Sequence, residues 1–322
     1  MDDFIEVKEL QKNYTVYERT GLKRKKRIVR ALRNVDFTVK RGEFLGYIGP
    51  NGAGKSTTIK ILTGIMVPDH GTVRVDKWCP WKNRKEYVKN IGVVFGQKTQ
   101  MWWDLPVKDT YTLLKALYKV PDDKYRKHIK YLIERLHLSE ILNQPVRQLS
   151  LGQRMRAELA AAMIHDPDIL FLDEPTIGLD VVSKHRVQDF LMELNRQGKT
   201  IFLTTHDLKD IETLCNEILI INHGTLIYKG KVPGLKALTD IPTVIRATLK
   251  ESYKKVSSES LRFLSEIGGT YHQERDEIVV KLHNKERPGE IAKRLFQKFE
   301  IEDFRVEEPD IEEIIKAIYR QN

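Results

Sequence analysis

A glycine-rich segment after a short apolar stretch constrains this chain more than any other feature. Residues 49–56 read Gly-Pro-Asn-Gly-Ala-Gly-Lys-Ser and fit the pattern G-x-x-x-x-G-K-[ST]. The apolar stretch Phe44–Ile48 predicts a strand before it, and the residues from 55 to about 63 predict a helix after it. Such a turn lets backbone N–H groups curl around phosphate, and the helix N-terminus adds partial positive charge. The residues predicted to surround the phosphates are Gly49, Pro50, Asn51, Gly52, Ala53, Gly54, Lys55, Ser56 and Thr57.

A second apolar run, residues 169–172, ends in two acids, Asp173 and Glu174. Behind a phosphate-binding loop, an aspartate at this position completes the coordination of Mg²⁺, which the Ser56 hydroxyl also binds. Glu174 is then placed to polarise an attacking water, while Lys55 reaches the β- and γ-phosphates. The two segments together predict a site that binds and hydrolyses a nucleoside triphosphate.

Length and composition set the outer limits. A chain of 322 residues allows one large domain or two modest ones. No apolar run approaches the roughly 18–20 residues that a membrane-spanning helix needs, and residues 1–8 hold three acids, so we expect neither a span nor a secretory signal. Cys79 and Cys215 lack metal-ligand spacing and are expected to be buried side chains in a reducing compartment.

The net charge of +10 is concentrated upstream, where residues 19–30 hold seven lysines and arginines. This basic segment lies between two stretches that predict paired strands, residues 5–10 and 31–39. The segment is short and has few interleaved aromatic residues, so we expect no specific nucleic-acid partner. Two interpretations remain open: a solvated hairpin tip, or a contact with anionic lipid headgroups or a membrane partner.

Helical spacing dominates residues 98–165, whereas residues 200–204 form a continuous apolar run typical of a buried parallel sheet. We therefore expect a nucleotide-binding domain over residues 1–231, with a helical subdomain at about 98–165. Residues 232–322 predict a small accessory or regulatory α+β domain of βαββαβ-like order, without a catalytic constellation. Its expected strands are 243–249, 277–282 and 304–307, and its expected helices are 256–267, 288–299 and 311–319.

The motifs that follow one another over residues 5–230 resemble those of the ATP-binding cassette (ABC) ATPase family. Gln97 looks like the Q-loop glutamine of that family, and His206 looks like its switch histidine, which touches the γ-phosphate. Residues 149–153, Leu-Ser-Leu-Gly-Gln, are similar to the family signature, usually LSGGQ, with Leu151 in place of a glycine. The D-loop, which crosses to the partner subunit, is matched by Gly178, Leu179 and Asp180.

The resemblance implies an α/β fold. Its parts are a P-loop NTPase (RecA-like) core with an antiparallel β subdomain and an α-helical signature subdomain, followed here by the small C-terminal α+β domain. It also implies ATP and Mg²⁺ as cofactors. The implied catalytic residues are Glu174, His206, Lys55 and Gln97, and the implied metal ligands are Ser56, Gln97 and Asp173.

In this family the signature of one subunit serves the nucleotide held by the other, which implies a homodimer or heterodimer of nucleotide-binding subunits. The signature residues Ser150, Leu151, Gly152 and Gln153 open a predicted helix, whose N–H groups form a second anion-binding end. Adenine is expected to stack on an aromatic residue near the end of the first strand. Tyr14 matches the family position best, and Tyr17 is the alternative.

Residues 95–106, Phe-Gly-Gln-Lys-Thr-Gln-Met-Trp-Trp-Asp-Leu-Pro, together with the tail, resemble cassettes of the ABC-2 export type, including drug and viologen exporter relatives. This resemblance implies a separate transmembrane ABC-2-type permease and a location on the cytoplasmic face of the membrane. Trp102 and Trp103 lie where the family receives a coupling helix, although a core position is equally consistent with the sequence. The alternatives are an importer cassette, or a soluble ABC ATPase acting without a permease on nucleic acid or as an assembly scaffold.

Overall fold

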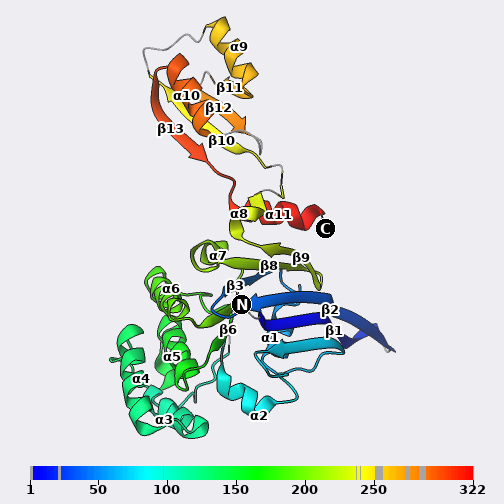
Figure 1. The fold of residues 1–322 in the computed structure, drawn as a ribbon, viewed down its shortest axis with the longest axis vertical. Helices are drawn as coiled ribbons and strands as arrows, with labels where there is room; N and C mark the ends of the chain where they lie inside the picture. Colours follow the sequence, from blue (N-terminus) through cyan, green and yellow to red (C-terminus); the bar gives the residue numbers. More distant parts are fainter. Residues whose placement is uncertain are drawn as a thin grey trace. The chain divides into compact units, whose positions relative to one another are not determined.

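The computed structural model describes residues 3–20, 23–96, 98–236, 238–239, 241–250, 257–272, 276–282 and 288–321. The chain forms two compact units, Met1–Val232 and Pro233–Asn322, which we treat one at a time (Figure 1). Among the described residues, no helix is both long enough and apolar enough to cross a bilayer.

The centre of the first unit is a six-stranded sheet with the strand order β5-β6-β7-β3-β8-β9. Neighbouring strands from β5 to β8 run parallel, and β9 pairs antiparallel with β8. Because β7 lies between β3 and β6, the carboxyl ends of these three strands meet at one edge of the sheet, where α/β proteins bind their ligands. The strands are β3 (Phe44–Ile48), β5 (Ile91–Phe95), β6 (Ile169–Asp173), β7 (Thr200–Thr204), β8 (Glu217–Asn222) and β9 (Thr225–Gly230).

Helices connect these strands in the way that a parallel sheet requires. Helix α1 (Lys55–Leu62) follows the glycine-rich segment, as predicted. Helix α6 (Val181–Arg196) joins β6 to β7, and α7 (Leu208–Leu214) joins β7 to β8. The buried rings of Tyr47 and Phe202 pack with their centroids 5.3 Å apart and tie β3 to β7. Two short elements precede β5: α2 (Arg84–Tyr87) and a 3₁₀ turn, η1 (Val88–Asn90).

The helical subdomain lies between β5 and β6, in the predicted part of the chain. It contains α3 (Val107–Tyr118), α4 (Asp122–Arg135), a 3₁₀ turn named η2 (Val146–Gln148), and α5 (Leu151–Met163). The apolar faces of these helices share one hydrophobic core with β6. Arg156 on α5 is 6% exposed, and its guanidinium donates to the carbonyl oxygens of Leu136 (2.6 Å) and His137 (2.7 Å). These bonds satisfy carbonyl groups at the C-terminal end of α4 and fix α5 against it.

The antiparallel sheet of the first unit, ordered β2-β1-β4, corrects the strand lengths expected around the basic segment. β1 (Asp3–Thr20) and β2 (Lys23–Lys40) extend far beyond the expected strands and stay paired out to Thr20↔Lys23. β4 (His70–Val75) pairs with β1 only between Ile5 and Gln11. Beyond that point β1 and β2 continue as a two-stranded ribbon (Figure 1).

The basic segment is therefore mostly paired strand. Val16, Ile28 and Val29 are β-branched, and Tyr14 and Tyr17 are aromatic, so the ribbon carries the residue types that favour strands between its charges. The dense lysines and arginines hide this pattern in the sequence, because they break the alternation of apolar and polar residues by which strands are recognised.

The second unit is a four-stranded antiparallel sheet of order β11-β12-β10-β13 with two helices packed on it. Its core includes Ile245, Leu264, Ile278 and Leu295, all almost completely buried. The elements follow the predicted βαββαβ order, and β11 is the strand for which no residue range was predicted. The elements are β10 (Thr243–Leu249), α9 (Ser258–Glu266), β11 (Gly269–His272), β12 (Glu277–Leu282), α10 (Pro288–Lys298) and β13 (Ile301–Glu307), with two further helices, α8 (Val232–Lys236) and α11 (Ile311–Gln321), in the chain.

Candidate active site

The loop between β3 and α1 forms a cradle of backbone groups. Gly54 caps the N-terminus of α1 with φ of 114°, a conformation that side chains disfavour. Gly49 is equally constrained, because a Cβ there would lie 2.4 Å from the Ile221 carbonyl oxygen. The loop is closed by a hydrogen bond from the Ala53 N–H to the Pro50 carbonyl oxygen at 3.1 Å. The first N–H groups of α1 are thereby held as donors for an anion.

Lys55 brings a positive charge into this cradle. Its side chain is 7% exposed, and Nζ donates to the carbonyl oxygens of Gly49 (2.6 Å) and Pro50 (3.2 Å). Burial lowers the pKa of Lys55, while the nearby charges of Glu174 and Asp173 act in the opposite direction. A buried ammonium of this kind gains most from a multiply charged anion, because a phosphate would supply the negative charge that its surroundings give only at a distance.

The two acids at the end of β6 are held by β7. The Thr204 hydroxyl donates to Asp173 Oδ1 at 2.5 Å, and the Glu174 N–H donates to the Thr204 carbonyl oxygen at 3.0 Å. Glu174 has a φ of 55°, an uncommon backbone conformation for a glutamate. Its Oε1 lies 3.4 Å from Nδ1 of His206 in the loop after β7. The turn thus directs the Glu174 carboxylate toward His206.

One cavity of about 1050 Å³ collects most of these groups, and Lys55 is not among the residues that line it. Its volume suits a nucleoside triphosphate. The predicted site residues that line it are Gly49, Pro50, Asn51, Gly52, Ser56, Asp173, Glu174 and His206. Gln97 lies outside the described residues, and its neighbours Gly96 and Lys98 line the same cavity.

The donor set fits a magnesium ion that arrives with its nucleotide. Ser56 offers a hydroxyl and Asp173 a carboxylate to the same cavity. Across the part of the chain that the structure describes, no group of three or more His, Cys, Asp and Glu side chains is arranged to hold a metal by itself. Mg²⁺ is usually bound by one or two protein ligands together with substrate phosphates and waters, so two oxygen ligands beside a phosphate cradle are sufficient.

Tyr14, the predicted adenine partner, lies against the start of α1. Its hydroxyl is 3.2 Å from the Thr57 hydroxyl and 3.2 Å from Met66 Sδ. Tyr17, the alternative, is further out on the ribbon and 64% exposed. The geometry therefore favours Tyr14 over Tyr17 as the aromatic residue beside the cradle.

The signature segment opens α5 with a complete capping box. The Ser150 hydroxyl accepts from the Gln153 N–H (3.2 Å), and the Ser150 N–H donates to Gln153 Oε1 (2.9 Å). Gly152 is tightly packed, because a Cβ there would lie 2.3 Å from the Ser183 hydroxyl oxygen on α6. The residues lining the cavity described above include none of Ser150, Leu151, Gly152 and Gln153. The N-terminus of α5 is thus separate from the cavity at the N-terminus of α1.

The chain is similar to known proteins over much of its length. The family described as "ABC transporter" matches residues 32–177. The ABC transporter ATP-binding protein NatA of Bacillus subtilis is 34% identical over 211 residues, covering 66% of this chain and 86% of NatA. The chain belongs to the ABC transporter ATP-binding family.

One further relative and one solved structure are also similar to this chain. The Nod factor export ATP-binding protein I of Ralstonia nicotianae is 37% identical over 198 residues, 61% of each chain. The dimeric ATP-binding cassette MJ0796, solved in a post-hydrolysis state bound to ADP and Pi, is 28% identical with a TM-score of 0.61, covering 70% of this chain and 98% of that one. The predictions of an ABC ATPase, of its fold class, and of ATP with Mg²⁺ as cofactors are confirmed.

In this ABC cassette residues 178–180, the predicted D-loop, lie between Leu151 of the predicted signature and the two acids at the end of β6. Gly178 has a φ of 68°, and a Cβ on it would lie 2.9 Å from Leu151 Cδ2, so Leu151 packs over this glycine. Leu179 packs partly buried against the core of the helical subdomain. Asp180 caps α6 by accepting from the Ser183 N–H at 2.9 Å, and hydrogen bonds from Ser183 hold its pKa below the usual value.

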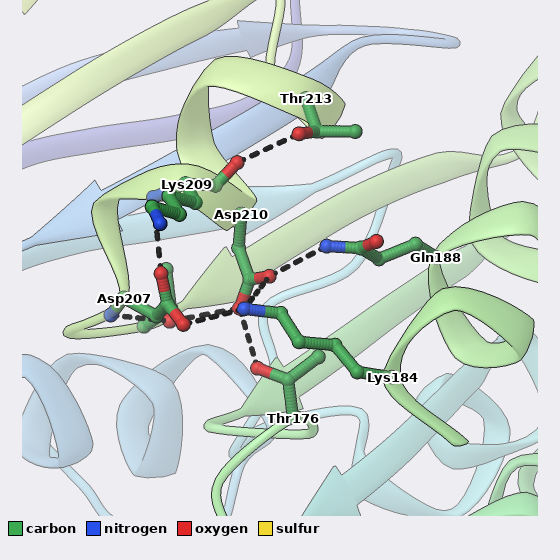
Figure 2. Close-up of polar contacts among 8 residues, drawn as sticks. Thr176, Lys184, Gln188, Asp207, Lys209, Asp210 and Thr213 are labelled. Atoms are coloured by element: carbon green, nitrogen blue, oxygen red, sulfur yellow. Dashed lines mark hydrogen bonds and ion pairs between the residues drawn. The ribbon is translucent and has the colours of Figure 1, made fainter. Parts of the chain in front are cut away.

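The structure also reveals a buried polar network beside the ABC site, which the sequence analysis missed (Figure 2). Asp210 on α7 has no exposed surface, and its carboxylate accepts from Thr176 Oγ1 (2.5 Å) and Gln188 Nε2 (2.7 Å). Lys184 Nζ on α6 lies 3.0 Å from Asp210 Oδ1 and 2.5 Å from Asp207 Oδ2. Thr176 follows Glu174 by two residues, and Asp207 directly follows His206. The network therefore connects the two loops that carry the catalytic candidates.

The network joins one ammonium, that of Lys184, to two carboxylates, those of Asp207 and Asp210. Burial acts to lower the pKa of Lys184, but its hydrogen bonds with Asp207 and Asp210 outweigh this effect and the pKa is raised. For Asp207, burial acts to raise the pKa, and Lys184 together with backbone donors lowers it overall. Lys184 and Asp207 are thus held in their charged forms. The sequence signal that could have indicated this network is an acid, Asp207, immediately after His206.

Proposed function

We propose that this chain is the ATP-hydrolysing subunit that powers export of a substrate through a separate transmembrane permease, working as a dimer of cassettes. The observation that carries the proposal is the separation of the signature helix from the cavity of the same chain. A helix N-terminus with its donors arranged around Ser150 is of no use to the chain's own nucleotide, and becomes useful when a second copy presents a triphosphate to it.

The residues that we assign to the site have different roles in hydrolysis. When bound, Mg²⁺ neutralises phosphate charge, and Ser56, Asp173 and Gln97 are the residues we assign to hold it. Lys55 positions the β- and γ-phosphates. Glu174 orients the attacking water and accepts its proton, and His206, 3.4 Å from Glu174, contacts the γ-phosphate and orients that carboxylate.

Export and a permease of the ABC-2 type are supported by the export name of one relative and by surface residues of the helical subdomain. Trp102 and Trp103 are 47% and 49% exposed, so they are not core residues. On α3, Leu113 and Leu117 are 44% and 69% exposed. Exposed large apolar side chains of this kind mark a protein-binding surface. We assign this surface to a coupling helix of the permease, which places the chain on the cytoplasmic face of the membrane.

The second unit is proposed to act on dimer lifetime or transport coupling. Each phosphate-site residue that we assign lies in the first unit, between Tyr14 and His206. The second unit has its own hydrophobic core, so it is built to fold as an accessory domain.

Two experiments test the proposal. Glu174→Gln incubated with MgATP should elute as a dimer on a sizing column, and adding Ser150→Arg should return it to a monomer, since the long side chain enters the phosphate site of the partner. A dimer that survives Ser150→Arg contradicts the shared site. Affinity purification from detergent-solubilised host membranes should recover a polytopic membrane protein. Recovery together with a substrate-capturing receptor would instead favour the importer alternative.

A further inference from the structure

The ribbon of β1 and β2 has one face that points away from the nucleotide site. In its register, Asn13 pairs with Arg30, Thr15 with Ile28 and Tyr17 with Lys26. Alternate positions of a strand share a face, so these six residues lie together on one side, which we call the outer face. Tyr14 belongs to the other side and contacts Thr57 on α1. The outer face therefore looks away from α1.

A basic hollow lies at the foot of the outer face. It has a volume of about 370 Å³ and is lined by Gln11, Asn13, Arg30, Leu32, Arg33 and Asn34. Its two arginines are exposed, and its other polar lining groups are side-chain amides. Guanidinium and amide N–H groups around one hollow form a donor set for a phosphate-type anion.

Above the hollow, the ribbon exposes apolar side chains. Tyr17 is 64% and Ile28 is 59% exposed on the outer face, and Val16 and Val29 on the other side are 43% and 40% exposed. The surrounding sequence is strongly basic, since residues 19–30 hold seven lysines and arginines and no acid. The ribbon thus combines positive charge with aliphatic and aromatic side chains that are about half exposed or more exposed than that.

We propose that the ribbon and its hollow bind the headgroups of an anionic membrane surface. The arginines of the hollow would pair with lipid phosphates, while Ile28 and Tyr17 enter the interface between headgroups and acyl chains, where such side chains are favoured. A nucleic acid would use the same cations but has no use for exposed isoleucine and valine, because bases stack on planar groups. The proposal rests on the proposed function only in that a permease would hold this chain beside a membrane.

Sedimentation of the purified full chain with vesicles tests this directly. The parent should bind vesicles of phosphatidylcholine mixed with phosphatidylglycerol, should not bind phosphatidylcholine alone, and should be released by salt. Arg30→Gln combined with Arg33→Gln should lower partitioning roughly 25-fold, since each basic residue near an anionic surface contributes roughly fivefold. Ile28→Thr keeps a β-branched residue in the strand and should weaken binding several-fold.

The matched control is Lys124→Gln combined with Lys127→Gln, which removes the same charge from exposed positions on α4 and should change partitioning by less than about threefold. The MgATP affinity of every variant is measured as a test of folding, and it should equal that of the parent. The proposal is overturned if the parent ignores anionic vesicles, if the control loses as much as the arginine variant, or if a single-stranded oligonucleotide competes the chain off the vesicles. Lipid binding without ATPase activity would instead count against the proposed function alone.

Discussion

The ammonium of Lys184 lies 3.0 Å from the carboxylate of Asp210, which has no exposed surface. Both side chains also contact the loops that follow β6 and β7. Lys184 reaches Asp207, next to His206, and Asp210 accepts from Thr176, two residues after Glu174 (Figure 2). One buried ion pair therefore holds the loop that carries Glu174 against the loop that carries His206.

Removing the cation should weaken both stability and turnover. Lys184→Met should lower the free energy of unfolding by about 2–3 kcal/mol, because it leaves a buried carboxylate without its counter-charge while Gln188 and Thr176 still donate to it. Urea unfolding followed by tryptophan fluorescence measures this in the first unit, which contains all four tryptophans. The ATPase rate of the folded variant should also fall, and an unchanged rate would exclude a positioning role.

A matched control exists for this substitution. Lys199 also forms an ion pair, but its partner Asp166 is 62% exposed. Lys199→Met should cost less than about 1 kcal/mol, since exposed pairs contribute little. Equal losses for the two variants would mean that burial of Asp210 has no special effect.

Substitutions at Glu174 and Lys55 should separate catalysis from nucleotide binding. Glu174→Gln keeps the shape and loses the proton acceptor, so MgATP binding should stay and turnover should fall about 100-fold or more. Lys55→Ala should instead weaken MgATP binding, because a buried charge partner of the phosphates is lost. Equilibrium binding and phosphate release distinguish the two effects. A Glu174→Gln rate within a few-fold of the parent removes Glu174 from its role.

His165 should make the first unit sensitive to mild acid. It stacks on Tyr118 with ring centroids 3.8 Å apart, Nε2 lies 2.9 Å from the Ile91 carbonyl oxygen, and burial lowers its pKa from 6.5 to about 4. The unfolded chain therefore binds the proton first as pH falls. The contribution of neutral His165 to the free energy of unfolding is therefore fully present above pH 6.5 and is lost progressively down to about pH 4. Between pH 7 and pH 5 the free energy of unfolding should fall by about 2 kcal/mol.

The variant His165→Phe keeps the ring stack and removes the titration. The same tryptophan-monitored unfolding at pH 7 and pH 5 should give a smaller difference for the variant than for the parent. If both proteins lose stability equally over this range, His165 is not the group that titrates.

Truncation of the chain tests whether the second unit contributes to ATP binding. A chain ending at Lys231 should bind MgATP within about threefold of the full chain, because the residues of the cavity and Tyr14 all precede the cut. The property expected to change is the lifetime of the ATP-bound dimer, followed by subunit exchange. A truncated chain that is folded by circular dichroism and yet cannot bind ATP would place part of the site in the second unit.

The cavity could be anticipated from sequence because its parts follow strands. Apolar runs that end in Gly49, Asp173 and near His206 are strong local signals, and parallel strands bring their carboxyl ends to one edge whatever the rest of the chain does. The helical subdomain was likewise visible from periodicity alone.

The features that could not be predicted from the sequence depend on long-range contacts or on short elements. Asp210 sits 26 residues from Lys184, and an aspartate on an amphipathic helix normally indicates an exposed position. The strand Gly269–His272 has only four residues and little pattern. The length of β1 and β2 was underestimated because lysines and arginines between the β-branched residues break the strand pattern. The pairing of the two strands becomes evident only in the structure.

The capping box at Ser150 has a consequence for the timing of ATP capture. The Ser150 oxygen accepts from the Gln153 amide, which leaves the hydroxyl proton free to rotate toward an approaching oxygen. A γ-phosphate can therefore take this proton in a hydrogen bond while the cap stays intact. In the dimer that we propose, no turn of helix has to unwind or refold when a second cassette closes on its nucleotide. The signature segment would then meet ATP as a rigid surface, and closure would depend on the approach of the two subunits.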